Sequence, residues 1–215
     1  MTMIAVFDSQ TETVERHLRE SALVKQRTAE CCTSAILSAA EIIAEVFRAG
    51  GKLLLCGNGG SAADCQHMAA EFTSRLSSDF ARPGLPAIAL TTDTSFLTAY
   101  ANDFDFEGVF ARQVQALGKA GDVLLGISTS GNSKNVIHAV ETAQRMNLRK
   151  IALTGSSGGR LKELVDIAIC IPSDNTQHIQ EAHLSIEHII CHLVERALFG
   201  EHGAGRWGMA NGNED

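Results

Sequence analysis

The fold is decided by the stretch from Lys52 to Arg75, which reads KLLLCGNGGSAADCQHMAAEFTSR. Its apolar run, Leu53 to Cys56, has the length of a buried strand. A Gly-Asn-Gly-Gly-Ser loop follows, and then an alanine-rich segment that contains no helix breaker. The stretch therefore predicts a strand, a tight turn and a helix in that order.

The glycine-rich loop after this strand can hold an anion. Gly57, Gly59 and Gly60 permit positive φ angles and a close approach of the backbone to a ligand. Ser61 can cap the new helix, whose first amides then point outward toward that ligand.

A second feature lies one to three turns further along the same helix. His67 and Glu71 are four residues apart, so they share a helix face. Both side chains could contact one metal ion or one substrate.

Length and charge narrow the class of protein. The chain has 215 residues and a formal net charge of -7, which suits one α/β domain with a helical extension. Clustered Lys and Arg are absent, so a nucleic-acid surface is not expected, although a few amides could still bind a small anion.

No apolar run approaches the roughly 20 residues of a membrane span, and the N-terminus has no signal-peptide pattern. We expect a cytoplasmic protein that does not bind membranes. Its six cysteines include no Cys-x-x-Cys pair, so we expect reduced thiols.

The remaining sequence alternates strands and helices. Residues 8–49 are expected to be helical, to cover one face of the sheet and to supply a subunit interface. Further strands are predicted at 87–90, 122–127, 151–153 and 167–171, and helices at 95–101, 106–117, 133–146, 160–164 and 177–199, with Asn102-Asp103 as an interruption. This order predicts a doubly wound, flavodoxin-like α/β fold: a five-stranded parallel sheet flanked by helices, with ligands at the carboxyl ends of the strands.

A second polar loop follows the predicted strand 122–127. Four hydroxyls gather there around the start of a helix, from Ser128, Thr129, Ser130 and Ser133. Hydroxyls often serve only as helix caps, but four around one glycine favour a phosphate site built from donors and the helix dipole. The sequence lacks Gly-Lys-Ser/Thr, so this loop is not a nucleotide P-loop.

The last predicted helix is unusually rich in side chains that titrate or coordinate metals. His183 and Glu187 are four residues apart, and so are His188 and His192. The spacing alone leaves both pairings open, and any one of these histidines could be an ordinary surface or core residue.

Several separated motifs together resemble the sugar isomerase (SIS) family, and most of all its phosphoheptose isomerases. The motifs are Gly57-Asn-Gly-Gly-Ser-Ala, Gln66-His-Met-Ala-Ala-Glu, Asn102-Asp-Phe, Gly126-Ile-Ser-Thr-Ser-Gly-Asn-Ser and Ile179-Gln-Glu-Ala-His followed by His188. The resemblance extends to about Phe199. It implies a homotetramer with active sites at subunit interfaces. It also implies conversion of D-sedoheptulose 7-phosphate to D-glycero-D-manno-heptose 7-phosphate through an enediol, the first step of ADP- or GDP-heptose biosynthesis.

The resemblance also assigns roles to individual residues. It implies a divalent metal, typically zinc and one per subunit, held by His67, Glu71, Gln180 and His188, with Glu71 and His188 as the acid/base pair. It implies that the phosphorylated sugar contacts Asn58, Gly59, Gly60, Ser61, Glu71, Asn102, Asp103, Ser128, Thr129, Ser130, Ser133 and Gln180. Arg75, one turn beyond Glu71, could orient that carboxylate. Gln177 departs from the family pattern, which has Asp three residues before the glutamine.

Length predicts one domain, the resemblance names it, and the glycine-rich C-terminus predicts a tail. Residues 1–200 are expected to form a single SIS domain that includes the N-terminal helical arm, and 201–215 a disordered tail.

Two other functions remain open at this point. Leu85-Pro-Ala-Ile-Ala-Leu and Gln113-Val-Gln-Ala-Leu-Gly also resemble non-catalytic SIS proteins that bind a replication initiator. In such a regulator the glutamate of the His-x-x-x-Glu pair is replaced, whereas this chain has Glu71. An isomerase acting on another phosphosugar is the other alternative.

Overall fold

A five-stranded parallel sheet forms the centre of the molecule. In the computed structural model, which describes residues 3–78 and 80–200, the strand order is β2-β1-β3-β4-β5. The strands are β1 (Leu53–Gly57), β2 (Ala87–Ala89), β3 (Val123–Ser128), β4 (Arg149–Thr154) and β5 (Ile167–Cys170). The predicted flavodoxin-like order and the parallel pairing are both confirmed.

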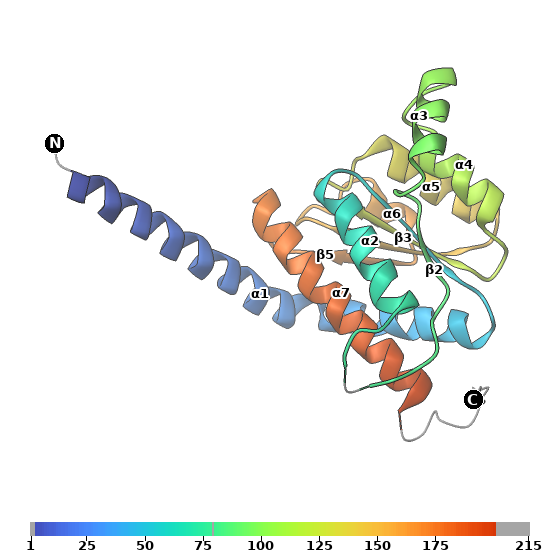
Figure 1. The fold of residues 1–215 in the computed structure, drawn as a ribbon, viewed down its shortest axis with the longest axis horizontal. Helices are drawn as coiled ribbons and strands as arrows, with labels where there is room; N and C mark the ends of the chain where they lie inside the picture. The colour runs from blue at the N-terminus through green and yellow to red at the C-terminus, as the bar shows by residue number, and fades with distance from the viewer. Residues whose placement is uncertain (1–2, 79, 201–215) are drawn as a thin grey trace, which may run out of the picture.

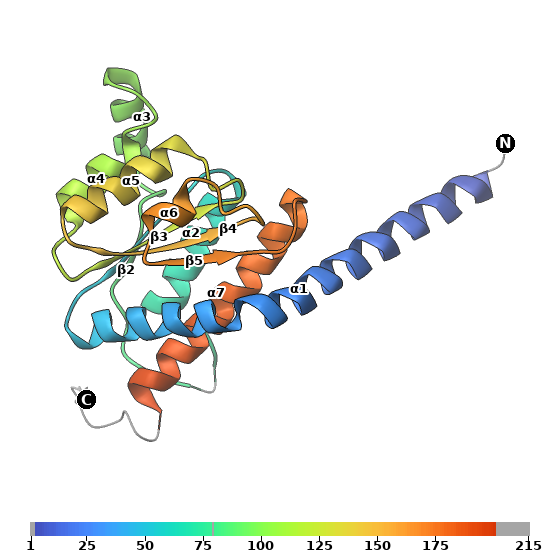
Figure 2. The ribbon, with the colours of Figure 1, turned by 180° about the vertical axis from the view of Figure 1, so that it is seen from behind.

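The described residues form seven helices. They are α1 (Met3–Arg48), α2 (Gly60–Thr73), α3 (Thr94–Asp103), α4 (Val109–Leu117), α5 (Lys134–Arg145), α6 (Leu161–Leu164) and α7 (Thr176–Phe199). Of these helices, all but α3 flank the sheet. Figures 1 and 2 show α1, α2 and α7 on one face and α4, α5 and α6 on the other.

Alternation along the buried strands produces two cores. In β1, Leu53 and Leu55 point toward α1, α2 and α7, whereas Leu54 and Cys56 point toward α4 and α5. Both faces of the sheet are covered, which explains why its central strands are continuously apolar.

The first helix does more than cover the sheet. Its C-terminal half packs in the core through residues such as Ile43 and Phe47, and Phe47 meets Phe72 of α2 edge-on with ring centroids 5.3 Å apart. Its N-terminal half projects away from the domain as an arm (Figure 1) and exposes Val14 and Leu18. The prediction of a helical arm with spare apolar surface is confirmed.

Several boundaries differ from the sequence-based prediction. Asn102 and Asp103 do not interrupt a helix but complete α3, which begins after Asp93 caps it by accepting from the Phe96 amide at 2.9 Å. The following helix, α4, begins at Val109 rather than 106. The expected tail, 201–215, lies outside the described residues.

Two further expectations concern cysteines and membranes. All six cysteines are free thiols. Among the described helices, none combines the length and the apolar character that crossing a bilayer requires.

Candidate active site

The two polar loops meet at the carboxyl edge of the sheet. Strands β1 and β3 are parallel neighbours, with Gly57 opposite Ile127, so the loops that follow them emerge side by side. The Asn58 amide donates to Asn135 Oδ1 at 2.9 Å, and the Asn135 amide donates back to Asn58 Oδ1 at 2.8 Å. This reciprocal pair ties the loop before α2 to the first turn of α5. Sequence reasoning missed Asn135, although its position two residues after Ser133 was visible.

Three of the four hydroxyls predicted to gather in the second loop lie close together, whereas the Thr129 hydroxyl makes no hydrogen bond with them. Ser128 Oγ lies 2.9 Å from Ser133 Oγ and 3.4 Å from Ser130 Oγ. Ser133 is the N-cap residue of α5, but its hydroxyl caps no helix amide. The routine capping role therefore does not explain this cluster, and the start of α5 remains able to bind an anion.

A cavity of about 330 Å³ adjoins this loop. It is lined by Thr129, Ser130, Asn132, Gly155, Ser156, Ser157, Ser173, Asp174, Thr176 and Ile179, so the loops after β3, β4 and β5 all contribute. Most of its lining residues offer hydroxyl, amide or carboxyl groups, so this cavity suits a polar ligand.

Gly131 is essential to the shape of the second loop. Its φ angle is +65°, and a Cβ there would lie 2.0 Å from the Gly158 carbonyl oxygen. Only glycine fits where the loops after β3 and β4 approach so closely.

A second group of side chains gathers where α2 packs against α7. His67 Nε2 lies 2.8 Å from His188 Nε2 and 3.6 Å from Glu71 Oε1. Ligand atoms of these three residues all lie within 4.8 Å of one another. The His67 side chain is 41% exposed and that of Glu71 is 18% exposed, so the group is open to a small molecule.

Gln180 belongs to α7, and its side chain lies beside the glycine-rich loop at the start of α2. A Cβ on Gly60 would come within 2.6 Å of Gln180 Nε2. Gly60 thus allows this amide to approach the backbone closely.

The structure resolves which histidine of the last helix joins the site. His188 is exposed and meets His67, whereas His183 is fully buried with Nε2 3.1 Å from the Thr154 carbonyl. Burial lowers the pKa of His183 to about 4, so it is neutral and structural. Glu187 is also fully buried, and the His183–Glu187 pairing is excluded as a surface site.

Two more acids lie near this group: Glu187, which is buried, and Asp64, which is partly buried. Burial, and next the nearby charge of Asp64, raise the pKa of Glu187 to about 8. Burial also raises the pKa of Asp64, although His67 partly opposes this. Both Glu187 oxygens lack hydrogen-bond partners among the described residues, which fits a protonated carboxyl.

Three sequence-based expectations are not met within one chain. Ser61 does not cap α2, because the N-cap residue is Gly59. Ser61 is instead the second residue of the helix, and it is buried. Asn102 and Asp103 lie exposed on α3, which stands apart from α2 and α7 (Figure 1). Among the described residues, the only side-chain hydrogen bond of this pair is the one that the Asn102 amide donates to Asp103 Oδ1 at 2.9 Å.

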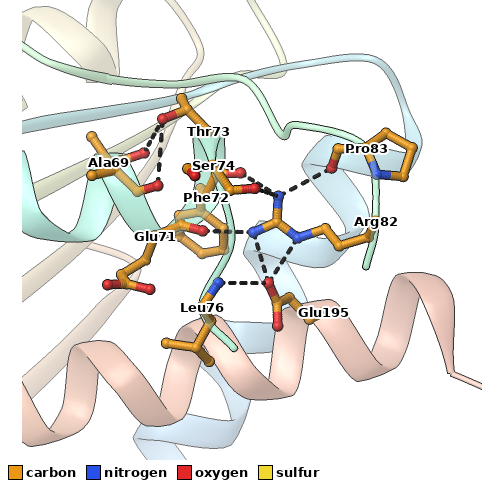
Figure 3. Close-up of polar contacts among 10 residues, drawn as sticks. Ala69, Glu71, Phe72, Thr73, Ser74, Leu76, Arg82, Pro83 and Glu195 are labelled. Carbon is orange, nitrogen blue, oxygen red and sulfur yellow. Dashed lines mark hydrogen bonds and ion pairs between the residues drawn. The ribbon is translucent and has the colours of Figure 1, made fainter. Parts of the chain in front are cut away.

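Arg75 also does not orient Glu71 as expected. Its side chain is exposed, and none of the polar contacts found in the described part of the chain joins it to that carboxylate. A different arginine, Arg82, contacts Glu71 instead, through the backbone (Figure 3).

The donor set fits a divalent cation such as zinc. Two imidazoles and a carboxylate are ligands that zinc accepts, and Glu71 Oε2 is buried with no hydrogen-bond partner among the described residues. The Nε2 atoms of His67 and His188 lie 2.8 Å apart, whereas two nitrogens held tetrahedrally at about 2.0–2.1 Å from one ion would be about 3.3 Å apart, so these rings would hold an ion after a small separation.

Comparison with known proteins gives the family. The model of the SIS domain matches residues 16–155. A phosphoheptose isomerase of Roseiflexus sp. (strain RS-1) is 54% identical over 194 residues, covering 90% of this chain and 98% of that protein. The chain belongs to the SIS domain family, and within it to the phosphoheptose isomerases.

Solved structures of the SIS domain agree. The phosphoheptose isomerase GmhA of Neisseria gonorrhoeae matches with a TM-score of 0.81 and 45% identity over 86% of this chain and 98% of that one. A phosphoheptose isomerase of Francisella tularensis matches with a TM-score of 0.83 and 39% identity, covering 87% and 98% of the two chains.

The neutral state of His183 leads to a prediction about acid stability. Its pKa is about 4 in the folded protein and about 6.5 when unfolded, so the unfolded state takes up a proton first as the pH falls. Between about pH 6.5 and pH 4, the contribution of His183 to the free energy of unfolding should fall by up to about 3 kcal/mol, at about 1.4 kcal/mol per pKa unit. Glu187, whose pKa is raised in the folded protein, contributes with the opposite sign between about pH 8 and pH 4.5, so the effect of His183 is isolated by comparison with a variant. Urea unfolding at several pH values measures this slope.

The matched control for this prediction is His183→Gln. The glutamine amide can still donate a hydrogen bond to the Thr154 carbonyl, but it does not titrate. The slope between pH 6.5 and 4 should be smaller in this variant. An NMR titration of wild-type His183 with a midpoint between pH 6 and 7 would contradict the assignment.

Proposed function

We propose that this chain catalyses the aldose–ketose isomerisation of D-sedoheptulose 7-phosphate to D-glycero-D-manno-heptose 7-phosphate, the first step of ADP- or GDP-heptose biosynthesis. The observation that carries the proposal is the meeting of His67, Glu71 and His188 at the α2–α7 contact. The relatives described above support the same reaction, because they are named phosphoheptose isomerases and are similar to this chain over most of its length.

The proposed mechanism moves one proton between neighbouring carbons. A base removes a proton from C1 of the ketose, and the electrons of that C–H bond form a C1=C2 double bond. The electrons of the C2 carbonyl move to its oxygen, which gains a proton and completes a cis-enediol. A proton then returns to C2, while the C1 hydroxyl loses its proton and becomes the aldehyde. Glu71 and His188 supply a carboxylate and an imidazole for these transfers, which require groups able to exchange protons near neutral pH.

The phosphate is proposed to bind at the other end of the site. The hydroxyls of Ser128, Ser130 and Ser133 and the start of α5 offer donors without a cationic side chain. Helix α7 connects the two ends: Thr176 lines the cavity there, and His188 lies about 18 Å further along at about 1.5 Å per residue. Gln180 and the loop of Asn58 lie between them, in the position expected for contacts with sugar hydroxyls. Binding a remote phosphate holds the open-chain sugar in place for reaction.

We propose one divalent metal per chain, with zinc as the ion the donors suit best. His67, Glu71 and His188 would hold it, and Gln180 would add a neutral amide oxygen. When bound, zinc polarises carbonyl and hydroxyl oxygens and stabilises negative charge that develops on them.

We also propose a homotetramer. The arm of α1 exposes Val14 and Leu18, and an apolar cavity of about 310 Å³ lies between α1 and α7, lined in part by Leu37 and Ile189. In a homotetramer, Asn102 and Asp103 would reach the site of a neighbouring chain, which would account for their place on the outlying α3.

The homotetramer predicts that light scattering gives a molar mass four times the 23.0 kDa of one chain. A monomer at assay concentration would exclude this role for both residues.

The other functions are less well supported. A non-catalytic regulator does not need the carboxylate of Glu71 held beside two imidazoles. An isomerase of a shorter phosphosugar would use the same groups, so substrate comparison is the way to distinguish it.

The acid/base assignment predicts the effect of two substitutions. Glu71→Gln removes a proton acceptor and His188→Ala removes an imidazole, so each should lower kcat by at least about 10²–10⁴-fold. NMR of sedoheptulose 7-phosphate turnover measures this, and circular dichroism verifies folding. His192→Ala, on the same helix but exposed and outside the group, is the matched control and should keep its activity. Turnover retained in either of the first two variants would refute the assignment.

The metal assignment predicts stoichiometric zinc binding. Isothermal titration should give one zinc ion per chain, and His67→Ala should weaken the affinity at least about tenfold because one of few ligands is lost. His192→Ala should bind zinc as the wild type does. A wild-type chain that binds no zinc, or that keeps full activity after prolonged chelation, would exclude the metal.

A further inference from the structure

Arg82 joins the two helices that carry the candidate active site. Its side chain is fully buried and forms an ion pair with Glu195 of α7, with Nη2 and Nε each 2.7 Å from Glu195 Oε1 (Figure 3). Glu195 is also buried, with 2% of its side chain exposed. A buried arginine is stable here only because its charge and its donors are satisfied by the protein.

The same guanidinium closes the carboxyl end of α2. Nη2 donates to the Glu71 carbonyl at 2.6 Å, and Nη1 donates to the Phe72 and Ser74 carbonyls at 2.5 and 3.2 Å. The last turn of α2 contains no basic residue of its own. Arg82 therefore supplies both the missing donors and the positive charge that the end of a helix favours.

On α7, the ion pair shares a face with the proposed acid/base residue. Glu195 follows His188 by seven residues, or about two helical turns, so both side chains face α2. Arg196 lies over the Phe80 ring at 4.2 Å, which attaches the segment around Arg82 to α7 a second time.

We propose that the Arg82–Glu195 pair is a positioning device for catalysis: it sets the last turn of α2, and with it the Glu71 carboxylate, relative to His188. This inference rests on the proposed function. Glu71 itself is the residue whose carbonyl Arg82 binds, so a shift of this turn moves the carboxylate directly. Reacting groups displaced by about 1 Å can lose about 100-fold in rate, so such a shift affects chemistry more than it affects phosphate binding at the distant start of α5.

A second ion pair offers a matched comparison. Lys52 Nζ lies 2.6 Å from Asp122 Oδ2, and 19% and 4% of their side chains are exposed. Asp122 also accepts from the backbone amides of Lys52 and Lys119, at 2.9 and 2.7 Å. It precedes β3, at the amino end of the sheet, so it supports the fold without contacting the site.

The experiment compares Glu195→Gln, Arg82→Lys and Asp122→Asn with the wild-type chain. Glu195→Gln keeps the shape but removes the negative charge, and Arg82→Lys keeps the charge but loses the planar fork. For each protein, kcat and KM for sedoheptulose 7-phosphate, the zinc dissociation constant and the thermal unfolding midpoint are measured.

We expect Glu195→Gln and Arg82→Lys to lower kcat about 10–100-fold and to weaken zinc binding by a similar factor, with KM changed less than about threefold. Asp122→Asn should keep kcat and zinc affinity within about twofold of the wild-type values, even if its unfolding midpoint falls as much as the midpoints of the other two variants. If one of the first two variants does not fold, the other decides.

Two results would overturn the inference while the wild type remains active: a folded Glu195→Gln or Arg82→Lys variant with unchanged kcat and zinc affinity, or an Asp122→Asn variant that loses as much as they do. A wild-type chain that neither turns over the sugar nor binds zinc would instead refute the proposed function, and the inference with it.

Discussion

The site depends on the packing of α2 against α7 over one face of the sheet. His67 and His188 are 121 residues apart in the chain, yet their ring nitrogens lie 2.8 Å apart. Neither helix alone supplies the group: α2 provides His67 and Glu71, which are four residues apart on one face, and α7 provides His188. The apolar core of Met68, Phe72, Ile186 and Ile190 holds the helices together, so core packing and site geometry are the same constraint.

The sheet places the other half of the site. Strand order reverses between β1 and β3, and in doubly wound sheets ligands bind at the carboxyl ends of the strands at this point. The Asn58–Asn135 amide pair spans that boundary and fixes the two loops relative to each other. The loop of Ser128 and the loop of Asn58 therefore lie side by side at the carboxyl edge of the sheet.

The sequence predicted the architecture well because its signals are local. Apolar runs, glycine loops and polar helix starts define the elements and their order, and parallel pairing brings the loops after β1 and β3 together. The cluster of His67, Glu71 and His188 agrees with the resemblance stated from the motifs, but spacing alone left two pairings open on α7. Burial of His183 and Glu187 excludes the first pairing, and His188 meets His67 of α2 rather than His192, so neither pairing forms the group. Both outcomes are properties of the folded chain.

Contacts made by irregular segments could not be predicted. Arg82 lies between α2 and β2, where no periodicity indicates which way a side chain points, so the exposed Arg75 was the more obvious partner for Glu71. Asn135 pairs across two loops, which only the strand order reveals. Asn102 and Asp103 lie exposed on α3, away from the other candidate site residues of the same chain. The role proposed for them rests on the proposed homotetramer.

The central claim is that this chain moves a proton between C1 and C2 of a ketose phosphate through an enediol. The most direct test is incubation of sedoheptulose 7-phosphate with the protein in D2O, followed by NMR of the product. Because a carboxylate or imidazole exchanges its proton with solvent, the account predicts a heptose 7-phosphate that carries deuterium at C2. Absence of product, or an aldose whose C2 hydrogen comes entirely from C1 of the ketose, would contradict it.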